Sequence, residues 1–491
     1  MQLDVNKHNF LLLEAKNISF RYSKKSEPVF SGLSLSVSDG EAILLMGPSG
    51  CGKSSLSYCL AGLYPAYAGQ LDGDIFIEGE LINGMSPCDR SRLVSILFQN
   101  PDNQFCMERV NQEILFALEN INYDGDLNAR MEELLDIVEL KNEKDAPIYT
   151  LSGGTKQKIA IATALATGAK MLILDEPLAN LDPASSLMVV SVLKKLHKNG
   201  LTLLIVDHKP QLWREFIDKV LLMDHKGNLS DKSLEPERLE EYSREFETRG
   251  IFLNDDWLLN YHPVQVPKPS NSIVKLEQVQ ISYNKKVILS DVSFELERGS
   301  VTVLVGGNGN GKTTLLSAMA GVIPYRGCIK IDGQAGLVFQ NPRFQFLTLS
   351  VEEEVLETLA INRPDDSNEL LIEEAEKLLD EFGLLELRKA SPYALSQGQQ
   401  RRLALLSMLA GEQSLLLIDE PTYAQDEKAT RFILDLLIRK AEAGLTAVIS
   451  THDLALAKAV ANRIFVVEGG KVTELLLQEF EEYIKERGIE K

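Results

Sequence analysis

Short apolar runs recur along the chain, and each has the length of a buried strand. Ala42 to Met46 and Val301 to Val305 are the clearest pair, and a glycine-rich stretch follows each. Runs of this kind are typical of a strand that is covered by helices on both faces. The segments beyond the glycines, Ser54 to Ala61 and Thr313 to Ala320, have a helical pattern. The pattern therefore predicts a strand, a loop and a helix in each half of the chain.

Alternation of apolar and polar residues marks a second kind of strand. It occurs near the start of each half, and it predicts antiparallel strands beside an α/β core. Further along each half the pattern becomes helical. The predicted strands are Asn17 to Tyr22, Leu33 to Val37, Val279 to Tyr283 and Val292 to Leu296, and the predicted helices are Met131 to Leu140, Leu370 to Phe382 and a terminal amphipathic helix from Glu474 to Glu490.

The length of 491 residues is too great for a single hydrophobic core. We expect two domains of roughly 200–250 residues each. Residues 230–249 are highly charged, and residues 264–272 contain two prolines and several small polar residues, as linkers do. We predict a first domain at residues 1–250, a linker at 251–272 and a second domain at 273–491.

Charge and composition exclude several classes of protein. A formal net charge of -20 disfavours broad binding to nucleic acid or to an anionic lipid surface. No apolar run reaches the roughly 18–20 residues of a membrane span, and no basic segment followed by an apolar one marks a signal peptide. We therefore expect the protein on the cytoplasmic side. Five cysteines without a Cys-x-x-Cys pair argue against a disulfide framework and against a zinc site.

The two glycine-rich stretches match G-x-x-x-x-G-K-[ST], the phosphate-binding loop, at residues 47–54 and 306–313. Its glycines let backbone N–H groups turn toward phosphates, and the following helix points its positive end at them. The lysine reaches the terminal phosphates, and the hydroxyl of the last residue holds Mg²⁺. The predicted ATP contacts are Gly47, Ser49, Gly50, Gly52, Lys53, Ser54, Ser55, Gly306, Asn308, Gly309, Gly311, Lys312, Thr313 and Thr314, of which Ser54 and Thr313 also bind the metal.

Further motifs follow both loops in the same order, which indicates an internal duplication. Each half has a Phe-Gln-Asn-Pro segment, a Leu-Ser-x-Gly turn, a strand that ends in Asp-Glu-Pro, and a strand followed by histidine. Gln99 and Gln340 lie 241 residues apart, and the other three pairs lie 244 residues apart. The first copy carries extra residues around Tyr64 to Arg92.

Acidic pairs end one apolar strand in each half. Asp175 and Asp419 fall at the carboxyl edge of the predicted parallel sheet, beside the phosphate-binding loop, where they can orient Mg²⁺ and its waters. Glu176 and Glu420 follow directly and are candidates to position or deprotonate the attacking water. We predict that the two glutamates are catalytic and that the two aspartates bind the metal.

Three other residue types recur at matched places. His208 and His452 follow a later strand, where an imidazole can contact the γ-phosphate and sense its loss. Gln99 and Gln340 lie in a strand-to-helix loop, where an amide can contact Mg²⁺ or water. An aromatic residue precedes each phosphate-binding loop, and we expect it to stack on adenine. The two aromatic residues are Tyr22 and Tyr283.

The Leu-Ser-x-Gly turns open helices and leave several N–H groups free, which makes a second anion site. A domain with a phosphate-binding loop does not need a second anion site for the same nucleotide. We therefore expect each turn to bind the γ-phosphate held by the other domain, so that ATP joins the halves and hydrolysis lets them part.

Taken together, these motifs resemble the ATP-binding cassette (ABC) ATPases over almost the whole chain. The resemblance implies two P-loop NTPase domains of the α/β class, each with a mixed-sheet core, an antiparallel β subdomain and a helical subdomain. It implies ATP hydrolysis with Mg²⁺ at two composite sites. One joins Lys53, Ser54, Gln99, Asp175, Glu176 and His208 to Ser396 and Gly398, and the other joins Lys312, Thr313, Gln340, Asp419, Glu420 and His452 to Ser152, Gly153 and Gly154.

Three positions depart from the family pattern. Gln397 replaces the first glycine of the second turn, and its side chain is expected to crowd the phosphate. Thr155 replaces the usual glutamine after the first turn. Residues 423–426 match the family's interface loop less well than residues 179–182. We therefore expect the site that uses Lys312 to be the more active one.

A narrower resemblance concerns the pattern Phe-Gln-x-Pro-x-x-Gln at residues 98–104 and 339–345. It is similar to the energy-coupling factor importers of vitamins and transition-metal ions, whose two ATPase cassettes contact a transmembrane scaffold. This implies a peripheral protein at the cytoplasmic face of the membrane, with a scaffold subunit and a substrate-binding membrane subunit as partners and no nucleic acid. Two alternatives stay open: a tandem cassette protein acting on the ribosome or nucleic acid, and the tandem ATPase of a sugar importer. The cargo cannot be read from the chain.

Overall fold

The computed structural model describes residues 10–179, 181–230, 233–249, 251, 253, 256–266, 271–283, 286–411, 413–422 and 427–486. The chain divides into two compact units, Met1–Asn254 and Asp255–Lys491. The domain limits expected from the sequence stay a prediction. Within the expected linker, Leu258 and Val264 are buried in the core of the second unit. No helix of the described residues is long and apolar enough to cross a membrane.

The first unit is built on a parallel five-stranded sheet. Its strand order places the strand before the phosphate-binding loop between two others, so that the loop leaves the middle of the sheet. All neighbouring strands run parallel, as the apolar runs predict. In spatial order the strands are β6 (Val94–Leu97), β7 (Met171–Asp175), β8 (Thr202–Val206), β3 (Ala42–Met46) and β9 (Lys219–Leu222).

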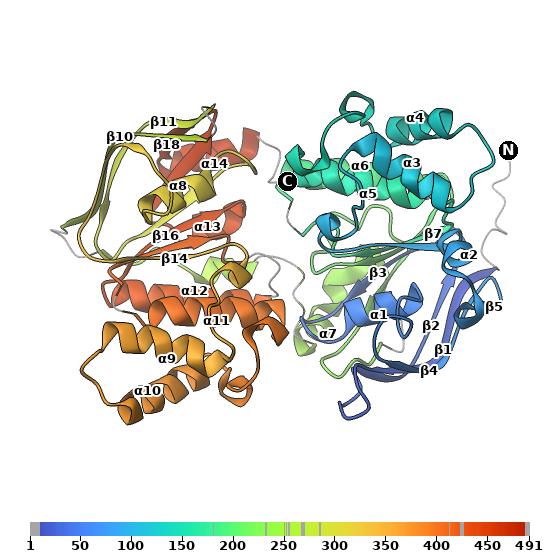
Figure 1. The fold of residues 1–491 in the computed structure, drawn as a ribbon, viewed down its shortest axis with the longest axis horizontal. Coiled ribbons are helices and arrows are strands. Elements are labelled where there is room, and N and C mark those ends of the chain that lie inside the picture. The colour runs from blue at the N-terminus through green and yellow to red at the C-terminus, as the bar shows by residue number, and fades with distance from the viewer. Residues whose placement is uncertain are drawn as a thin grey trace. The chain divides into compact units, whose positions relative to one another are not determined.

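Two hydrophobic cores cover the two faces of this sheet. Alternate residues of β3 enter different cores: Leu44 packs with the helices of one face, and Ile43 and Leu45 pack with the other. This is the period of two that a strand imposes on its side chains. Figure 1 shows α3 to α6 on one side of the sheet and α1 with the antiparallel strands on the other. The helices are α1 (Lys53–Leu60), α2 (Pro87–Ser91), α3 (Val110–Asn120), α4 (Leu127–Ile137), α5 (Gly153–Ala166), α6 (Pro183–Lys198) and α7 (Ser243–Thr248), with short 3-10 turns at η1 (Ile82–Gly84), η2 (Pro101–Asn103), η3 (Lys141–Glu143), η4 (Ile148–Thr150) and η5 (Pro236–Tyr242).

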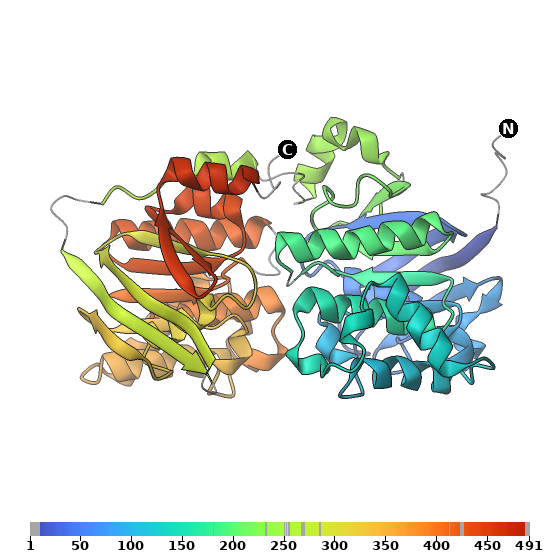
Figure 2. The same cartoon turned by 90° about the horizontal axis from the view of Figure 1, so that it is seen from above.

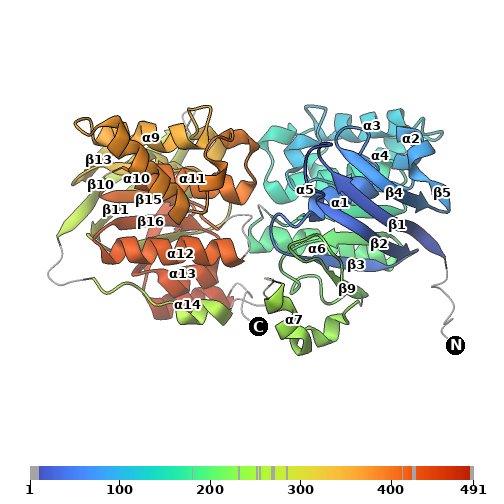
Figure 3. The ribbon, with the colours of Figure 1, turned by 90° about the horizontal axis from the view of Figure 1, so that it is seen from below.

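The alternating segments of the first unit form an antiparallel sheet, as predicted, which lies beside α1 (Figure 3). Ala15 pairs with Leu35 and with Ile75, so that the first strand lies between two others. The residues that the first copy has in excess include β5, η1 and α2. The strands are β2 (Phe30–Ser38), β1 (Leu11–Arg21), β4 (Gln70–Ile77) and β5 (Glu80–Leu81), in spatial order.

The second unit repeats this plan. Its main sheet is parallel except for the last strand, and its antiparallel strands form a long ribbon (Figure 2). The main sheet has the order β14 (Ala335–Val338), β15 (Leu415–Asp419), β16 (Thr446–Thr451), β12 (Val301–Val305), β17 (Arg463–Glu468) and β18 (Lys471–Leu475), and the ribbon has the order β11 (Lys286–Glu297), β10 (Ser272–Tyr283) and β13 (Arg326–Ile331). The helices are α8 (Lys312–Met319), α9 (Val351–Asn362), α10 (Asn368–Glu381), α11 (Gln397–Leu409), α12 (Glu427–Glu442), α13 (Leu454–Val460) and α14 (Leu477–Glu486), with turns η6 (Asp256–Asn260), η7 (Pro342–Phe344), η8 (Leu385–Leu387) and η9 (Pro392–Ala394).

The fold class predicted from the sequence is confirmed. Each unit combines a mainly parallel sheet, an antiparallel β part and a helical part, which is α3 to α5 in the first unit and α9 to α11 in the second. The predicted helices at residues 131–140 and 370–382 correspond to α4 and α10. The predicted terminal helix corresponds in its described part to α14, but it begins at Leu477, and Glu474 belongs to strand β18 instead.

Candidate functional site

The phosphate-binding loop of the first unit connects β3 to α1. Gly52 ends the loop with φ 106°, a left-handed conformation that a residue with a Cβ atom adopts only with strain. Its successor Lys53 is buried, and its Nζ donates to the carbonyl oxygens of Gly47, at 2.8 Å, and Pro48, at 2.9 Å. The lysine therefore lies over the concave side of its own loop, where its charge faces any phosphate that the loop binds.

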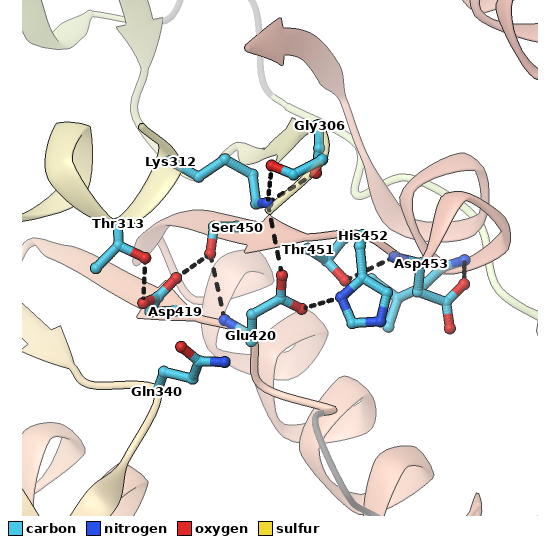
Figure 4. A network of polar contacts seen from close by, with 12 residues as sticks. Gly306, Lys312, Thr313, Gln340, Asp419, Glu420, Ser450, Thr451, His452 and Asp453 are labelled. Atoms are coloured by element: carbon cyan, nitrogen blue, oxygen red, sulfur yellow. Dashed lines mark hydrogen bonds and ion pairs between the residues drawn. The ribbon is translucent and has the colours of Figure 1, made fainter. Parts of the chain in front are cut away.

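The loop of the second unit has the same construction (Figure 4). Gly311 has φ 100°, and Lys312 Nζ donates to the carbonyl oxygens of Gly306, at 2.7 Å, and Gly307, at 3.3 Å. A Cβ atom on Gly306 would come within 2.4 Å of the carbonyl oxygen of Val467, so only glycine fits there. The two loops thus share both the backbone turn and the position of the lysine.

A buried carboxylate receives the hydroxyl of each loop. Ser54 Oγ donates to Asp175 Oδ1 at 3.0 Å, and Thr313 Oγ1 donates to Asp419 Oδ2 at 2.7 Å. The other oxygen of Asp419 also accepts a hydrogen bond from Ser450 Oγ (Figure 4). These hydroxyl and carboxylate oxygens are the hard ligands that Mg²⁺ prefers, so the side chains in each unit fit a magnesium ion.

Burial raises the pKa of both aspartates. The pKa of Asp175 rises from 3.8 to about 6, mainly through burial and secondly through the negative charge of Glu176. Burial also raises the pKa of Asp419, while the hydrogen bonds from Ser450 and Thr313 oppose that rise. A cation beside these carboxylates would remove the cost of burying their charge.

The two glutamates adopt a left-handed backbone. Glu176 has φ 46° and Glu420 has φ 50°, a region that non-glycine residues occupy at a cost of roughly 1–2 kcal/mol. Each backbone N–H donates across to the next strand, to the carbonyl oxygen of Val206 at 2.9 Å and of Ser450 at 3.0 Å. Backbone strain at a polar site favours a functional role for the strained residue, here each glutamate, because the strain fixes the direction of its side chain.

The carboxylate of Glu176 joins two other predicted site residues. Gln99 Nε2 donates to its Oε2 at 2.7 Å, and His208 Nε2 lies 3.0 Å from its Oε1. Burial would raise the pKa of Glu176, but the charge and hydrogen bond of His208 and the charge of Lys53 lower it below its ordinary value. In the first unit the sequence-predicted glutamine, glutamate and histidine therefore form one network.

The carboxylate of Glu420 has different neighbours. His452 lies 3.0 Å away through Nδ1, the opposite ring nitrogen from the one that His208 uses, and Lys312 Nζ lies 3.9 Å away. Burial alone would lower the pKa of His452, but neighbouring negative charge, chiefly that of Glu420, outweighs burial and raises this pKa above its ordinary value. Gln340 is exposed, and Figure 4 draws no contact of its amide with Glu420.

Ser152 and Ser396 cap the N-termini of helices α5 and α11 and bond residues of their own helices. Ser396 Oγ accepts from the N–H of Gln399, and Gln399 Oε1 accepts from the N–H of Ser396, which together form a capping box. Ser152 Oγ accepts from the N–H of Thr155 at 3.3 Å. A Cβ atom on Gly154 would meet Ser185 Cβ at 2.8 Å, so this glycine lets α5 approach α6.

The aromatic residues before the loops are both exposed, as adenine contact requires. The hydroxyl of Tyr22 lies 2.7 Å from Ser55 Oγ, which ties the ring to α1. Tyr283 is the matched residue of the second unit. Of the loops that differ between the copies, Asn180 and residues 423–426 lie outside the described residues.

Sequence reasoning missed two residues that support the site of the second unit. Ser450 bonds Asp419, and Arg401 donates to backbone carbonyls of the glutamine loop. The first unit has Val206 and Gln157 at the matched positions, so the repeat gave no signal for either. Arg401 lies within the polar start of its helix, between Gln400 and Arg402, so its residue type gave no signal either.

Comparison with known proteins decides the family. The model of the ABC transporter family matches residues 30–179 and 289–423. The chain belongs to the ABC transporter family. This ABC protein is 33% identical to "Putative HMP/thiamine import ATP-binding protein YkoD" of Bacillus subtilis strain 168, across 93% of the chain and 90% of that protein. It is 31% identical to an ABC transporter ATP-binding protein of Streptococcus pneumoniae serotype 4, across 94% of the chain and 90% of the relative.

Solved structures agree with the fold. An archaeal ABCE1 in a model of ribosome-bound Pelota and ABCE1 has a TM-score of 0.69 at 20% identity, covering 96% of this chain and 80% of that one. A structure named RNase-L Inhibitor has a TM-score of 0.64 at 21% identity, covering 96% and 93%. At these identities the likeness concerns the fold alone. Through its family the chain is an ATP-binding, ATP-hydrolysing ABC ATPase.

Proposed function

We propose that this ABC ATPase powers an importer of the energy-coupling factor type, which takes up a vitamin or a transition-metal ion through separate membrane subunits. The chain lies in this proposal at the cytoplasmic face of the membrane, bound to a scaffold subunit that works with a substrate-binding subunit. The name of the Bacillus subtilis relative, an HMP/thiamine import protein, supports a vitamin or its precursor as cargo.

The observation that carries the proposal is the repeated segment after each glutamine loop. In both units an asparagine caps a short 3-10 turn: Asn100 accepts from the N–H of Asp102, and Asn341 accepts from the N–H of Arg343. In the second unit Phe344, Leu347 and Leu349 lie 77%, 91% and 86% exposed around this turn. Large apolar side chains gathered on one exposed segment are typical of a protein contact.

A buried carboxylate holds the loop after each of these turns. Glu113 accepts hydrogen bonds from the N–H groups of Cys106, at 2.9 Å, and Met107, at 2.7 Å. Glu354 accepts from the N–H groups of Leu347, at 3.0 Å, and Thr348, at 3.1 Å. Hydrogen bonds to a buried carboxylate thus hold the backbone that carries the exposed apolar side chains. A rigid backbone of this kind suits a surface that transmits force to a partner.

The roles of the site residues follow as part of the same proposal. Lys53 and Lys312 bind the terminal phosphates, and the hydroxyl and aspartate of each unit hold Mg²⁺, which neutralises phosphate charge when bound. Glu176 and Glu420 orient the attacking water and accept its proton, and each histidine fixes the carboxylate of its glutamate. The expectation that one ATP is completed by Ser152, Gly153 and Gly154, and the other by Ser396 and Gly398, stays a prediction.

Purification of the tagged chain from its native membrane tests the proposal. We expect a transmembrane scaffold and a small membrane subunit to co-purify, and we expect their loss when Phe344 and Leu347 are both replaced by Ser. Leu370→Ser, at another exposed apolar position of the same unit, is the matched control and should keep both partners. Recovery of ribosomal proteins without membrane subunits would overturn the importer assignment in favour of a ribosome-acting ATPase.

A further inference from the structure

Helix α11 carries Arg401, whose buried guanidinium group contacts the backbone at the site of the second unit. Arg401 is 3% exposed, and its Nη1 donates to the carbonyl oxygens of Phe339, at 2.8 Å, and Asp419, at 3.4 Å. Its Nη2 donates to the carbonyl oxygen of Gln340 at 2.6 Å. The planar guanidinium of Arg401 therefore bonds both the glutamine loop and the end of β15, where Asp419 and Glu420 lie.

The first unit has no equivalent contact at the matched position among its described residues. Gln157 takes the place of Arg401, and it is 1% exposed with its Nε2 unbonded in the described structure. There, helix α5 reaches the segment after the glutamine through an ion pair, Lys156 Nζ to Asp102 Oδ1 at 2.8 Å. Among the described residues, the second unit alone thus fixes the backbone of the glutamine loop and of the aspartate to one side chain.

We propose that Arg401 is a positioning residue that makes the metal site of the second unit tighter than that of the first. By holding the peptide groups of Phe339, Gln340 and Asp419 together, it keeps the Gln340 amide and the Asp419 carboxylate at a fixed separation. A preformed separation lowers the cost of ordering ligands around a cation. This inference rests on the metal-binding role proposed for Asp419 and on the contact with Mg²⁺ that the sequence predicts for Gln340.

Binding of Mn²⁺, measured by electron paramagnetic resonance, tests the proposal without hydrolysis. The full chain carries Glu176→Gln and Glu420→Gln, and ATP is saturating. We expect two bound Mn²⁺ ions of unequal affinity. Arg401→Gln should weaken the tighter one about tenfold, which corresponds to ~1.4 kcal/mol, and Arg401→Lys should weaken it less because one donor group remains. Arg402→Gln is the matched control, since Arg402 donates to the carbonyl oxygen of Phe382 in the helical part instead.

Amide hydrogen exchange supplies the second readout. Arg401→Gln should speed exchange over residues 339–345, and Gln157→Arg should slow exchange over residues 98–104 of the first unit. If Arg401→Gln does not fold, the Gln157→Arg result alone decides. Equal Mn²⁺ affinity and equal exchange in the Arg401→Gln and Arg402→Gln chains overturn the proposal. Failure of the underlying function is distinct: Asp419→Asn would then leave both Mn²⁺ ions bound.

Discussion

The two units have equivalent side chains in their candidate sites and differ in the contacts that those side chains make. In the first unit Glu176 bonds Gln99 and meets the Nε2 atom of its histidine. In the second unit Glu420 meets the Nδ1 atom of its histidine and approaches a lysine. The phosphate-binding loop, the hydroxyl–aspartate pair and the left-handed glutamate are common to both. The comparison teaches that the two copies have equivalent side chains in the candidate site, whereas the residues that contact those side chains differ.

The largest expected effect comes from removing each carboxylate in turn. Glu420→Gln should abolish most steady-state ATPase activity, and Glu176→Gln should cost a smaller share. The reason is that the side chain of Gln397 is expected to crowd the helix N-terminus that is predicted to complete the first site. A general base contributes roughly 10²–10⁴-fold at its own site. Turnover of both variants at saturating MgATP decides the order, and a greater loss from Glu176→Gln would show that the ranking is wrong.

The next effect concerns stability and sharpens the contrast between the aspartates. The pKa of Asp175 is about 6 in the folded chain against 3.8 for an ordinary aspartate. The buried, ionised carboxylate therefore destabilises the fold in full above pH 6, and this destabilisation disappears below pH 3.8. The difference corresponds to about 3 kcal/mol. Asp175→Asn should therefore stabilise the ligand-free first unit at pH 8 and do so less at pH 5.

Urea unfolding at these two pH values measures this gain. Asp419→Asn is the paired variant, and it should give a smaller gain because Ser450 and Thr313 already compensate that carboxylate. A gain from Asp175→Asn that does not change between pH 8 and pH 5 would contradict the assigned cause.

We expect a smaller effect from replacing Ser450 of the second unit with valine, the residue at the matched position, Val206, of the first unit. Ser450→Val removes one donor from Asp419 while keeping a β-branched residue suited to the buried strand. The pKa of Asp419 should rise further, and the second unit should lose about 1–2 kcal/mol at pH 8. Ser450→Thr, which keeps the hydroxyl, is the control in the same unfolding assay. Equal stability of the two variants would show that the hydroxyl contributes nothing.

The smallest effect concerns the histidine of the second unit. Because Glu420 raises the pKa of His452, their contact stabilises the fold below the ordinary histidine value of 6.5 and is lost as the pH rises through the raised value. We expect a contribution below about 1 kcal/mol at pH 7.5. Proton NMR should show His452 titrating above 6.5, and Glu420→Gln should return it toward or below that value. Titration of His452 below 6.5 in the unaltered chain would refute the pairing.

Much of the fold could be predicted because its signals are local. The apolar run Ala42 to Met46 and the glycines after it specify a strand and a loop through short-range geometry, and the duplication supplied each prediction twice. The aspartates and glutamates could be placed because a strand carries its last residues to the edge of its sheet. The same rule places Ser450 at that edge, but its contact with Asp419 also requires that β15 and β16 be neighbours, which the sequence does not state. No such rule exists for Arg401, whose partner Gln340 lies 61 residues away. The first contact depends on the order of the strands and the second on how α11 packs beside the sheet, and residue spacing encodes neither.

The left-handed backbone at Glu176 and Glu420 has a practical consequence for engineering. Glycine relieves that strain, so a search for heat-resistant variants should favour Glu176→Gly or Glu420→Gly wherever the roughly 1–2 kcal/mol of relieved strain exceeds the cost of the lost histidine contact and of a more flexible unfolded chain. Such winners would survive heating and turn over no nucleotide at the altered position. Robustness and turnover therefore conflict at these two residues, and any selection for hardier forms of this chain has to screen for phosphate release at the same time.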